Sequence, residues 1–229
     1  GRLKINKLKK DFACSDRMFA LNVKINFFTP ETYFRGTDSR ELNKNYICVN
    51  RAEELFKFSQ SQLKLNSEKI EKIKKFNIII LIGPPASGKS EFSNKLTNYN
   101  IINQDNLKTK TNTLSKMKKI LKDNINSKII SDNTNGTLKY RKTFTDYLTE
   151  LKLEYCFVKL LINKEQSFLL NNYRCNLLKK ERLPDVVIHT YYKKYNEPTN
   201  KEGYKELFEL DFIPKYKNKT EENIFYQYY

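Results

Sequence analysis

The strongest hydrophobic pattern in the chain is the run FNIIILIG at residues 76–83, which is almost continuously apolar and rich in β-branched residues and ends in glycine. A run of this kind is typical of a strand buried on both faces of a parallel sheet. Such a strand needs helices to cover it. Residues 90–96, 114–121 and 138–151 carry apolar positions at helical spacing and are predicted to be those helices.

Each predicted helix is followed by a short apolar stretch that reads as a strand, at residues 100–102, 128–130 and 155–162. Strands and helices therefore alternate from residue 76 to residue 162. This alternation predicts an α/β fold, a doubly wound parallel sheet. Residues 200–229 are compatible with a final edge strand and with either an ordered or a frayed tail.

The residues before the first strand differ in character. Residues 63–75 place a few apolar side chains among many charges, which is typical of an exposed helix or a linker. Residues 1–62 include a helical-looking stretch and a second short helix that opens at Thr29-Pro30, but they are too few to form a domain of their own. We expect three parts: residues 1–62, a linker or exposed helix at 63–75, and the α/β domain at 76–229.

The charge balance points to a polyanionic partner. Forty-three Lys and Arg stand against 26 Asp and Glu, a formal net charge of +17. Such a surplus attracts nucleic acid at long range. The heavy use of Lys and Asn can also reflect coding composition alone, and both interpretations are open at this point.

Other broad classes are disfavoured. The four cysteines are widely separated and form no CxxC pair, so neither a zinc site nor a redox motif is predicted. The longest apolar run is far shorter than the ~20 residues that cross a bilayer, so no membrane span is expected. The chain begins Gly1-Arg2 without a signal-peptide pattern, and we expect it to be part of a longer protein.

Residues 83–90 read GPPASGKS and match the P-loop pattern at every fixed position, between the predicted strand and helix. The glycines let the backbone wrap so that N–H groups point at phosphate oxygens. Lys89 is expected to reach the β- and γ-phosphates, and Ser90 to bind the Mg²⁺ that bridges them. The residues predicted to bind ATP or GTP are Gly83, Pro84, Pro85, Ala86, Ser87, Gly88, Lys89 and Ser90.

Two acids follow predicted strands. In a doubly wound sheet of the P-loop NTPase type they would lie at the carboxyl ends of the strands, where ligands bind. Asp105 could deprotonate an attacking hydroxyl, or it could cap the helix that follows. Asp132 stands where a P-loop protein keeps its metal-binding acid, although Asp132-Asn133 could also form a simple polar turn.

Two arginines could neutralise charge on a transferring phosphate. Arg141 lies on the helix after Asp132, and Arg174 lies on the helix after the strand at 155–162. The guanidinium fork matches phosphate geometry. A solvated helix face is the alternative for either residue.

Beyond these motifs, the chain resembles the polynucleotide kinase 3'-phosphatase family of DNA-end repair enzymes over nearly its whole length. The N-terminal KDFACSDRMFALN at residues 10–22 looks like the end of that family's haloacid dehalogenase-like phosphatase domain. The phosphatase motif DxDGT does not occur in the sequence. In the kinase part the matching strings are the P-loop, NQD at 103–105, DNTN at 132–135, Arg141, NN at 171–172, RLPDVV at 182–187, YKKYNEPT at 192–199 and EGY at 202–204.

The resemblance implies an ATP- and Mg²⁺-dependent kinase of polynucleotide 5'-hydroxyl ends. Carried over by position, Lys89 contacts the ATP phosphates, Ser90 and Asp132 serve Mg²⁺, and Asp105 activates the 5'-hydroxyl. The family has arginines flanking the position after its paired asparagines, whereas this chain reads Tyr173-Arg174-Cys175, so the lid role of Arg174 is left open.

The resemblance also implies a monomer that acts on DNA in the nucleus and meets other DNA-repair proteins, within a longer parent that carries the 3'-phosphatase. Two rival functions stay open: a P-loop kinase of a nucleoside or other small molecule, and a non-catalytic nucleotide-binding scaffold. The preference for DNA or RNA, and for single or double strands, is not predicted.

Overall fold

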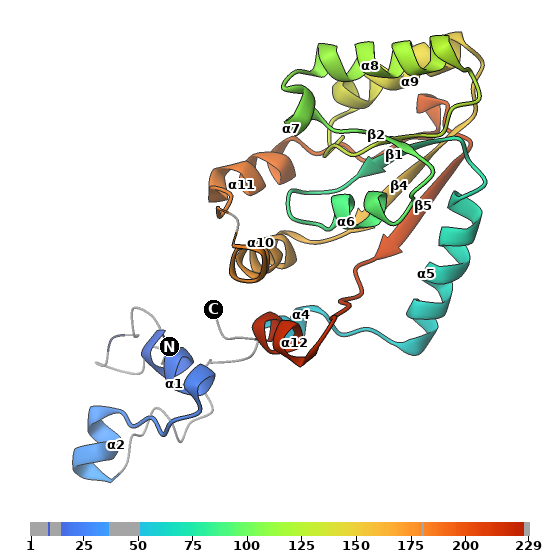
Figure 1. The fold of residues 1–229 in the computed structure, drawn as a ribbon. Coiled ribbons are helices and arrows are strands. Elements are labelled where there is room, and N and C mark those ends of the chain that lie inside the picture. Colours follow the sequence, from blue (N-terminus) through green and yellow to red (C-terminus); the bar gives the residue numbers. More distant parts are fainter. Residues whose placement is uncertain (1–8, 10–14, 37–50, 180, 227–229) are drawn as a thin grey trace. The chain divides into compact units, whose positions relative to one another are not determined.

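The computed structural model describes residues 9, 15–36, 51–179 and 181–226 (Figure 1). The chain divides into two compact units. The larger unit is Phe58–Lys215, and the smaller one combines Gly1–Lys57 with Tyr216–Tyr229.

The larger unit is built on a five-stranded sheet in the order β2-β3-β1-β4-β5, in which every pairing is parallel. The predicted α/β fold with a doubly wound parallel sheet is confirmed. All five residues of the central strand are buried, as the continuous apolar run predicts. The strands are β1 (Ile78–Ile82), β2 (Asn100–Ile102), β3 (Ile129–Ser131), β4 (Tyr155–Leu161) and β5 (Glu206–Asp211).

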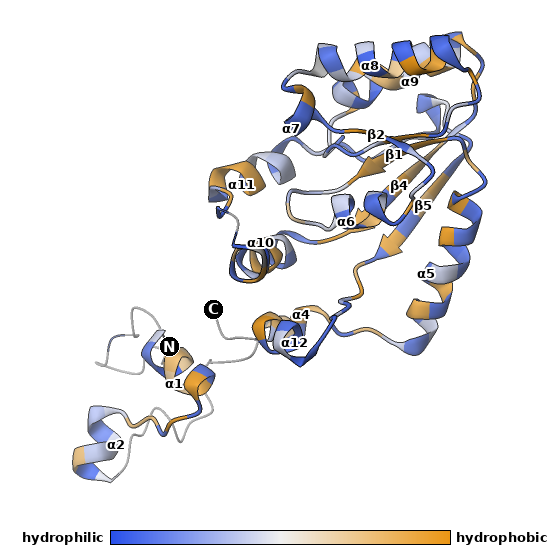
Figure 2. Ribbon diagram, in the orientation of Figure 1, coloured by the Kyte–Doolittle hydropathy of each residue, from blue (hydrophilic) through white to orange (hydrophobic). Residues whose placement is uncertain are grey.

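Helices cover both faces of this sheet. Alternate residues of β1 point to opposite faces, so Ile80 packs with Met117 and Phe144 while Ile79 packs with Ile73. Figure 2 shows the apolar strands between helices whose outer faces are polar. The helices of this unit are α5 (Gln60–Ile73), α6 (Lys89–Asn94), α7 (Gln104–Leu107), α8 (Lys110–Asp123), α9 (Leu138–Glu150), α10 (Lys164–Leu178), α11 (Asp185–Lys194) and the 3₁₀ turn η1 (Asn200–Glu202).

Most of residues 63–75, expected to form a linker or an exposed helix, lies in α5, which belongs to the larger unit. The helix opens with a capping box between Ser59 and Gln62, and its last residue, Ile73, is fully buried against the sheet. The Asn66 amide donates to the carbonyl oxygen of Asp211, at 2.8 Å. A sparse apolar stripe among charges therefore marks a covering helix here rather than an exposed connection.

The smaller unit contains α1 (Ser15–Val23), α2 (Pro30–Arg35), α4 (Arg51–Leu55) and α12 (Lys219–Phe225). Thr29 caps α2 ahead of Pro30, as the sequence predicts. The final edge strand is confirmed as β5, but the tail beyond it groups with residues 1–57 rather than with the α/β domain. Its Phe225 is fully buried, with its ring 5.1 Å from that of Phe56.

Some of the expectations fall on residues outside the described ranges. Cys14 and Cys48 are among them, as is the first half of the string at residues 10–22. Within the described ranges, no helix has the length and hydrophobicity to cross a membrane.

Candidate active site

The phosphate-binding loop connects β1 to α6 at the edge where the parallel strands end (Figure 1). Gly88 has a φ of 85°, a left-handed conformation that favours glycine, and Ala86 also has a positive φ of 63°. At Gly83 a Cβ atom would lie only 2.8 Å from the Ser87 hydroxyl. The fixed glycines of the motif are thus required by local geometry.

Lys89 is buried at the start of α6 and folds back onto the loop. Its ammonium donates to the carbonyl oxygens of Gly83 and Pro84, at 3.1 and 2.6 Å, and lies 3.3 Å from the Ser87 hydroxyl. Burial lowers the pKa of Lys89 to about 8.

The charges that act on the Lys89 ammonium are those of the predicted site residues. The carboxylates of Asp132 and Asp105 raise its pKa, and the guanidinium of Arg174 lowers it. Coulombic effects of this kind fall off with distance, so these three groups lie near the phosphate-binding loop. The structure therefore gathers Lys89, Asp105, Asp132 and Arg174 at one end of the sheet.

Asp132 directly follows β3 and is buried, as expected of a metal-binding acid. Its Oδ2 atom accepts from the Asn103 amide at 3.2 Å and from the Ser93 hydroxyl at 3.4 Å. Its Oδ1 atom is buried and has no hydrogen-bond donor in the described part of the chain. A buried carboxylate oxygen without a donor is a costly arrangement that a cation or its bound water would relieve.

These features fit Mg²⁺. Mg²⁺ is commonly held by one or two protein oxygens together with waters and substrate phosphates, rather than by a cage of protein ligands. Among the described residues, no group of three or more His, Cys, Asp and Glu side chains could hold a metal. Asp132 and the exposed hydroxyl-bearing Ser90 are the residues that would hold Mg²⁺ here.

Asp105 is the second residue of α7, and its side chain is exposed. The helix cap is Asn103, whose side-chain oxygen accepts from the Asp105 backbone N–H at 2.7 Å. The alternative role of Asp105 as the cap is therefore wrong. Its carboxylate makes no hydrogen bond or ion pair with any residue the structure describes, so it is available to a substrate.

Asn133 and Tyr140, to which the sequence analysis gave no role of their own, hold α7 in place through Gln104. The Gln104 backbone N–H donates to the side-chain oxygen of Asn133, at 2.7 Å. The Gln104 side-chain oxygen accepts from the Tyr140 hydroxyl of α9, also at 2.7 Å. Asn133 and Gln104 lie within the matched strings NQD and DNTN, but the pattern alone does not show that the two strings contact each other.

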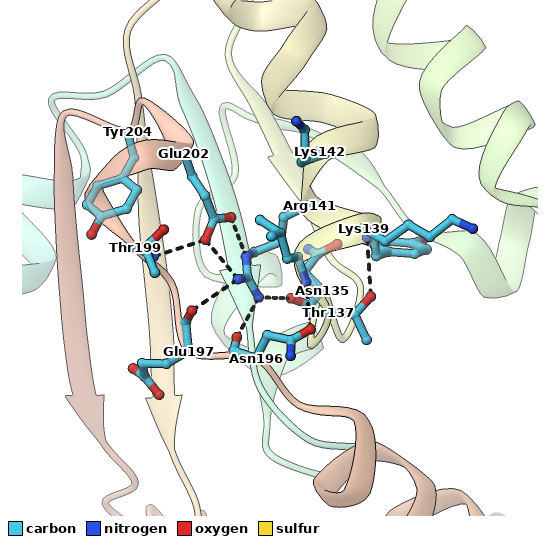
Figure 3. Close-up of polar contacts among 12 residues, drawn as sticks. Asn135, Thr137, Lys139, Arg141, Lys142, Asn196, Glu197, Thr199, Glu202 and Tyr204 are labelled. Carbon is cyan, nitrogen blue, oxygen red and sulfur yellow. Dashed lines mark hydrogen bonds and ion pairs between the residues drawn. The ribbon is translucent and has the colours of Figure 1, made fainter.

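Arg141 does not have the predicted role. It is fully buried, and its guanidinium forms a two-point ion pair with Glu202, with N···O distances of 2.6 and 2.8 Å (Figure 3). The remaining N–H groups donate to carbonyl oxygens of Asn135, Asn196 and Glu197. Because the N–H groups of this buried guanidinium already have acceptors inside the protein, it is not placed to contact a transferring phosphate.

The Arg141 cluster supports the site indirectly. Asn135, which accepts from Arg141, donates through its amide to the Leu81 carbonyl of β1 at 2.7 Å. Its neighbour Thr134 accepts from the Gly83 N–H at 3.1 Å. Arg141 therefore fixes the loop after β3, and this loop holds the start of the phosphate-binding loop.

Arg174 lies on α10, which with α11 forms a lid-like helical pair near the end of the sheet (Figure 1). The adjacent Asn171 is buried and exchanges two hydrogen bonds with the Leu183 backbone, at 2.9 and 3.1 Å. Asn172 accepts from Arg182 at 2.8 Å. The paired asparagines thus tie the middle of α10 to the residues just before α11. Arg174 itself forms no hydrogen bond or ion pair with another described residue.

Comparison with known proteins shows which proteins this chain is similar to. Residues 1–34 match the family described as Polynucleotide kinase 3 phosphatase. The chain is 28% identical over 211 residues to the bifunctional polynucleotide phosphatase/kinase of Schizosaccharomyces pombe, covering 88% of this chain and 48% of that protein. It is 31% identical over 214 residues to a protein of Acanthamoeba polyphaga mimivirus that provisionally bears the same name, covering 88% of this chain and 49% of the viral protein.

The chain is similar to proteins of the polynucleotide kinase 3'-phosphatase family. The resemblance drawn from the motifs is confirmed by these matches. The chain spans about half the length of the curated relatives it matches.

A solved structure with a similar arrangement is Chaetomium thermophilum Kti12 in complex with ADP-AlF3. The TM-score is 0.46 and the sequence identity 15%, over 65% of this chain and 95% of Kti12.

Proposed function

We propose that this chain transfers the γ-phosphate of ATP to the 5'-hydroxyl end of a polynucleotide. The finer features of the proposal are Mg²⁺ as the metal, a DNA strand as the acceptor, a role in strand-break repair in the nucleus, contact with other repair proteins, and action as a monomer. Similarity to relatives named polynucleotide phosphatase/kinase and the net charge of +17 support a nucleic-acid acceptor.

The observation that carries the proposal is the gathering of charges around Lys89. At the carboxyl end of the sheet, the phosphate-binding Lys89 feels the charge of two carboxylates. One is the buried Asp132, which has an oxygen without a donor in the described chain, and the other is the exposed Asp105. Phosphoryl transfer needs these three parts: a cradle for the phosphates, a metal ligand and a group that orients the nucleophile.

Each residue then has a defined task. The loop N–H groups and the Lys89 ammonium would bind the phosphates, which replace the loop carbonyls and Ser87 as partners of Lys89. Asp132 and Ser90 would hold Mg²⁺, which when bound neutralises charge on the β- and γ-phosphates. Asp105 would accept the proton of the 5'-hydroxyl as that oxygen attacks, and Arg174 would contact phosphate oxygens.

The relatives are named for two activities, and we propose only the kinase for these residues. The sequence lacks the DxDGT string that the phosphatase mechanism of the family requires. A 3'-phosphatase would belong to a longer parent protein, as in the relatives that exceed this chain in length.

A transfer assay with radiolabelled ATP tests the proposal. The acceptors are matched DNA and RNA oligonucleotides with a 5'-hydroxyl, the same oligonucleotides with a 5'-phosphate, and free nucleosides. We expect label on 5'-hydroxyl oligonucleotides and none on the 5'-phosphate controls. Transfer to nucleosides alone would establish the small-molecule kinase, and transfer to no acceptor would favour the non-catalytic scaffold. The ratio of DNA to RNA labelling measures the preference that the sequence leaves open.

A further inference from the structure

A cavity of about 380 Å³ lies beside the phosphate-binding loop and is not used by the chemistry above. Its walls are Pro84, the end of β4, the start of α10 and one face of α11. The carbonyl oxygen of Pro84 also accepts a hydrogen bond from the Lys89 ammonium, so the cavity and the phosphate site share this residue. A volume of this size lies within the range of ~300–1,000 Å³ found for small-ligand sites.

Tyr191 and Tyr192 of α11 line the cavity together with Tyr195, which directly follows the helix. The Tyr191 ring stands edge-on to that of Tyr192 at 5.3 Å and is inclined to that of Tyr195 at 5.6 Å. The Tyr192 hydroxyl donates to the Ile162 carbonyl at 2.7 Å, and the Tyr195 hydroxyl donates to Glu197 at 3.0 Å. Two of the rings are therefore held in place by their own hydroxyl groups.

Tyr191 differs from its two neighbours. Its ring lies directly on the backbone of Gly136, where a Cβ atom would come within 2.4 Å of the ring. Its hydroxyl makes no hydrogen bond with any residue in the described ranges. Burial raises the pKa of Tyr191, so the hydroxyl stays protonated and can donate.

The charged side chains of the wall leave no unpaired cation for a phosphate, which favours an uncharged occupant. Lys159 and Glu197 both line the cavity and pair with each other, and Lys159 also pairs with Glu209, which is not part of the wall. An ammonium already engaged by two carboxylates attracts a further anion only weakly. Tyrosine faces instead suit a flat ring that carries hydrogen-bonding groups, and every nucleobase has such a face.

We propose that this cavity binds a nucleobase while the phosphate-binding loop holds ATP. The inference rests on the proposed kinase function, which brings two sources of nucleobase to this end of the sheet: the acceptor strand and the ATP itself. The same aromatic chemistry recognises both.

The test compares Tyr191→Leu and Tyr195→Leu, which remove a ring but keep bulk. The control is Tyr147→Leu, a half-buried tyrosine on α9 outside the cavity, and melting temperatures confirm folding. Two quantities are measured: the ratio of kcat/KM for 5'-hydroxyl oligonucleotides with and without a base at the first or second nucleotide, and the KM for ATP. Two variants at separate positions keep the test decisive if one fails to fold.

If the cavity holds a strand base, the unaltered chain prefers the base-bearing oligonucleotide about tenfold. Both cavity variants then lose this preference, at an unchanged KM for ATP. If it holds the base of ATP, the KM for ATP rises about tenfold in both cavity variants, and the strand preference stays. Values equal to those of Tyr147→Leu for both quantities would overturn the site. Absence of transfer by the unaltered chain would overturn the kinase proposal, and this inference with it.

Discussion

At the scale of single residues, the buried ion pair between Arg141 and Glu202 joins α9 to the segment that leads into β5. Both side chains are almost completely inaccessible to water. An exposed pair of the same type, Lys205 with Glu154, offers a comparison, because ion pairs in water contribute only ~0–1 kcal/mol.

We predict that Arg141→Ala lowers the free energy of unfolding by about 3–5 kcal/mol, because Glu202 is left buried without its partner. Lys205→Ala should cost about 1 kcal/mol or less. Urea denaturation of both variants measures the difference. A stable Arg141→Ala protein with an increased KM for ATP would restore the phosphate-binding role that the sequence suggested for this arginine.

Arg141 also marks the limit of sequence interpretation at this scale. Residue type and order predicted a functional arginine, but its partner stands 61 residues further along the chain. No periodicity or spacing connects the two. Asp132 does lie directly after a strand, as predicted, since position in a parallel sheet follows directly from the strand pattern.

At the scale of elements, the phosphate-binding loop takes its shape from glycines and backbone contacts rather than from Lys89. Ser87 is packed within the loop, and Ser167 of α10 donates to the Pro85 carbonyl at 2.7 Å. The bond from Ser167 does not involve Lys89, so we expect it to persist when the lysine is removed.

We predict that Lys89→Ala keeps its fold but loses transfer by about 10²- to 10³-fold or more, because a positive charge aimed at the phosphates is lost. Circular dichroism, melting temperature and steady-state kinetics are measured on one preparation. Lys95→Ala, on an exposed lysine just after α6, is the matched control and should leave turnover unchanged. Near wild-type turnover in Lys89→Ala would refute the assignment of the loop.

The strands were predictable because each is a short apolar run between segments whose apolar residues have helical spacing. Their ends were less so: β3 runs from Ile129 to Ser131, one residue later than predicted. Helix α8 starts at Lys110, four residues before its first predicted residue, because Thr109 caps it and polar residues fill its first turn. Apolar spacing reports the buried face of a helix and not its capped end.

At the scale of the whole molecule, the surplus of 43 basic over 26 acidic residues gives a strand-binding protein a strong dependence on salt. We predict that oligonucleotide affinity falls steeply between about 50 and 200 mM salt, by ~10³-fold or more if at least six phosphates are contacted. Fluorescence anisotropy with a labelled oligonucleotide measures the slope. A flat response would assign the charge to coding composition and strengthen the case for a small-molecule kinase.

The grouping of the two chain ends lay beyond sequence analysis. Sequence analysis left open whether the tail is ordered or frayed, whereas Phe225 is fully buried, packed beside Phe56 and Tyr216. Single aromatic residues in polar surroundings carry no periodic signal, so only the structure reveals their contacts.

The measurement that tests the central claim most directly is single-turnover phosphorylation by Asp105→Asn. The change keeps the size of the side chain and removes the base, while Asn103 still caps α7. We predict unchanged ATP affinity and melting temperature and a ~10²- to 10⁴-fold slower transfer. Asp146→Asn, the same change at an exposed surface pair on α9, should transfer at the normal rate. Normal transfer by Asp105→Asn would contradict the account and move the base to another residue.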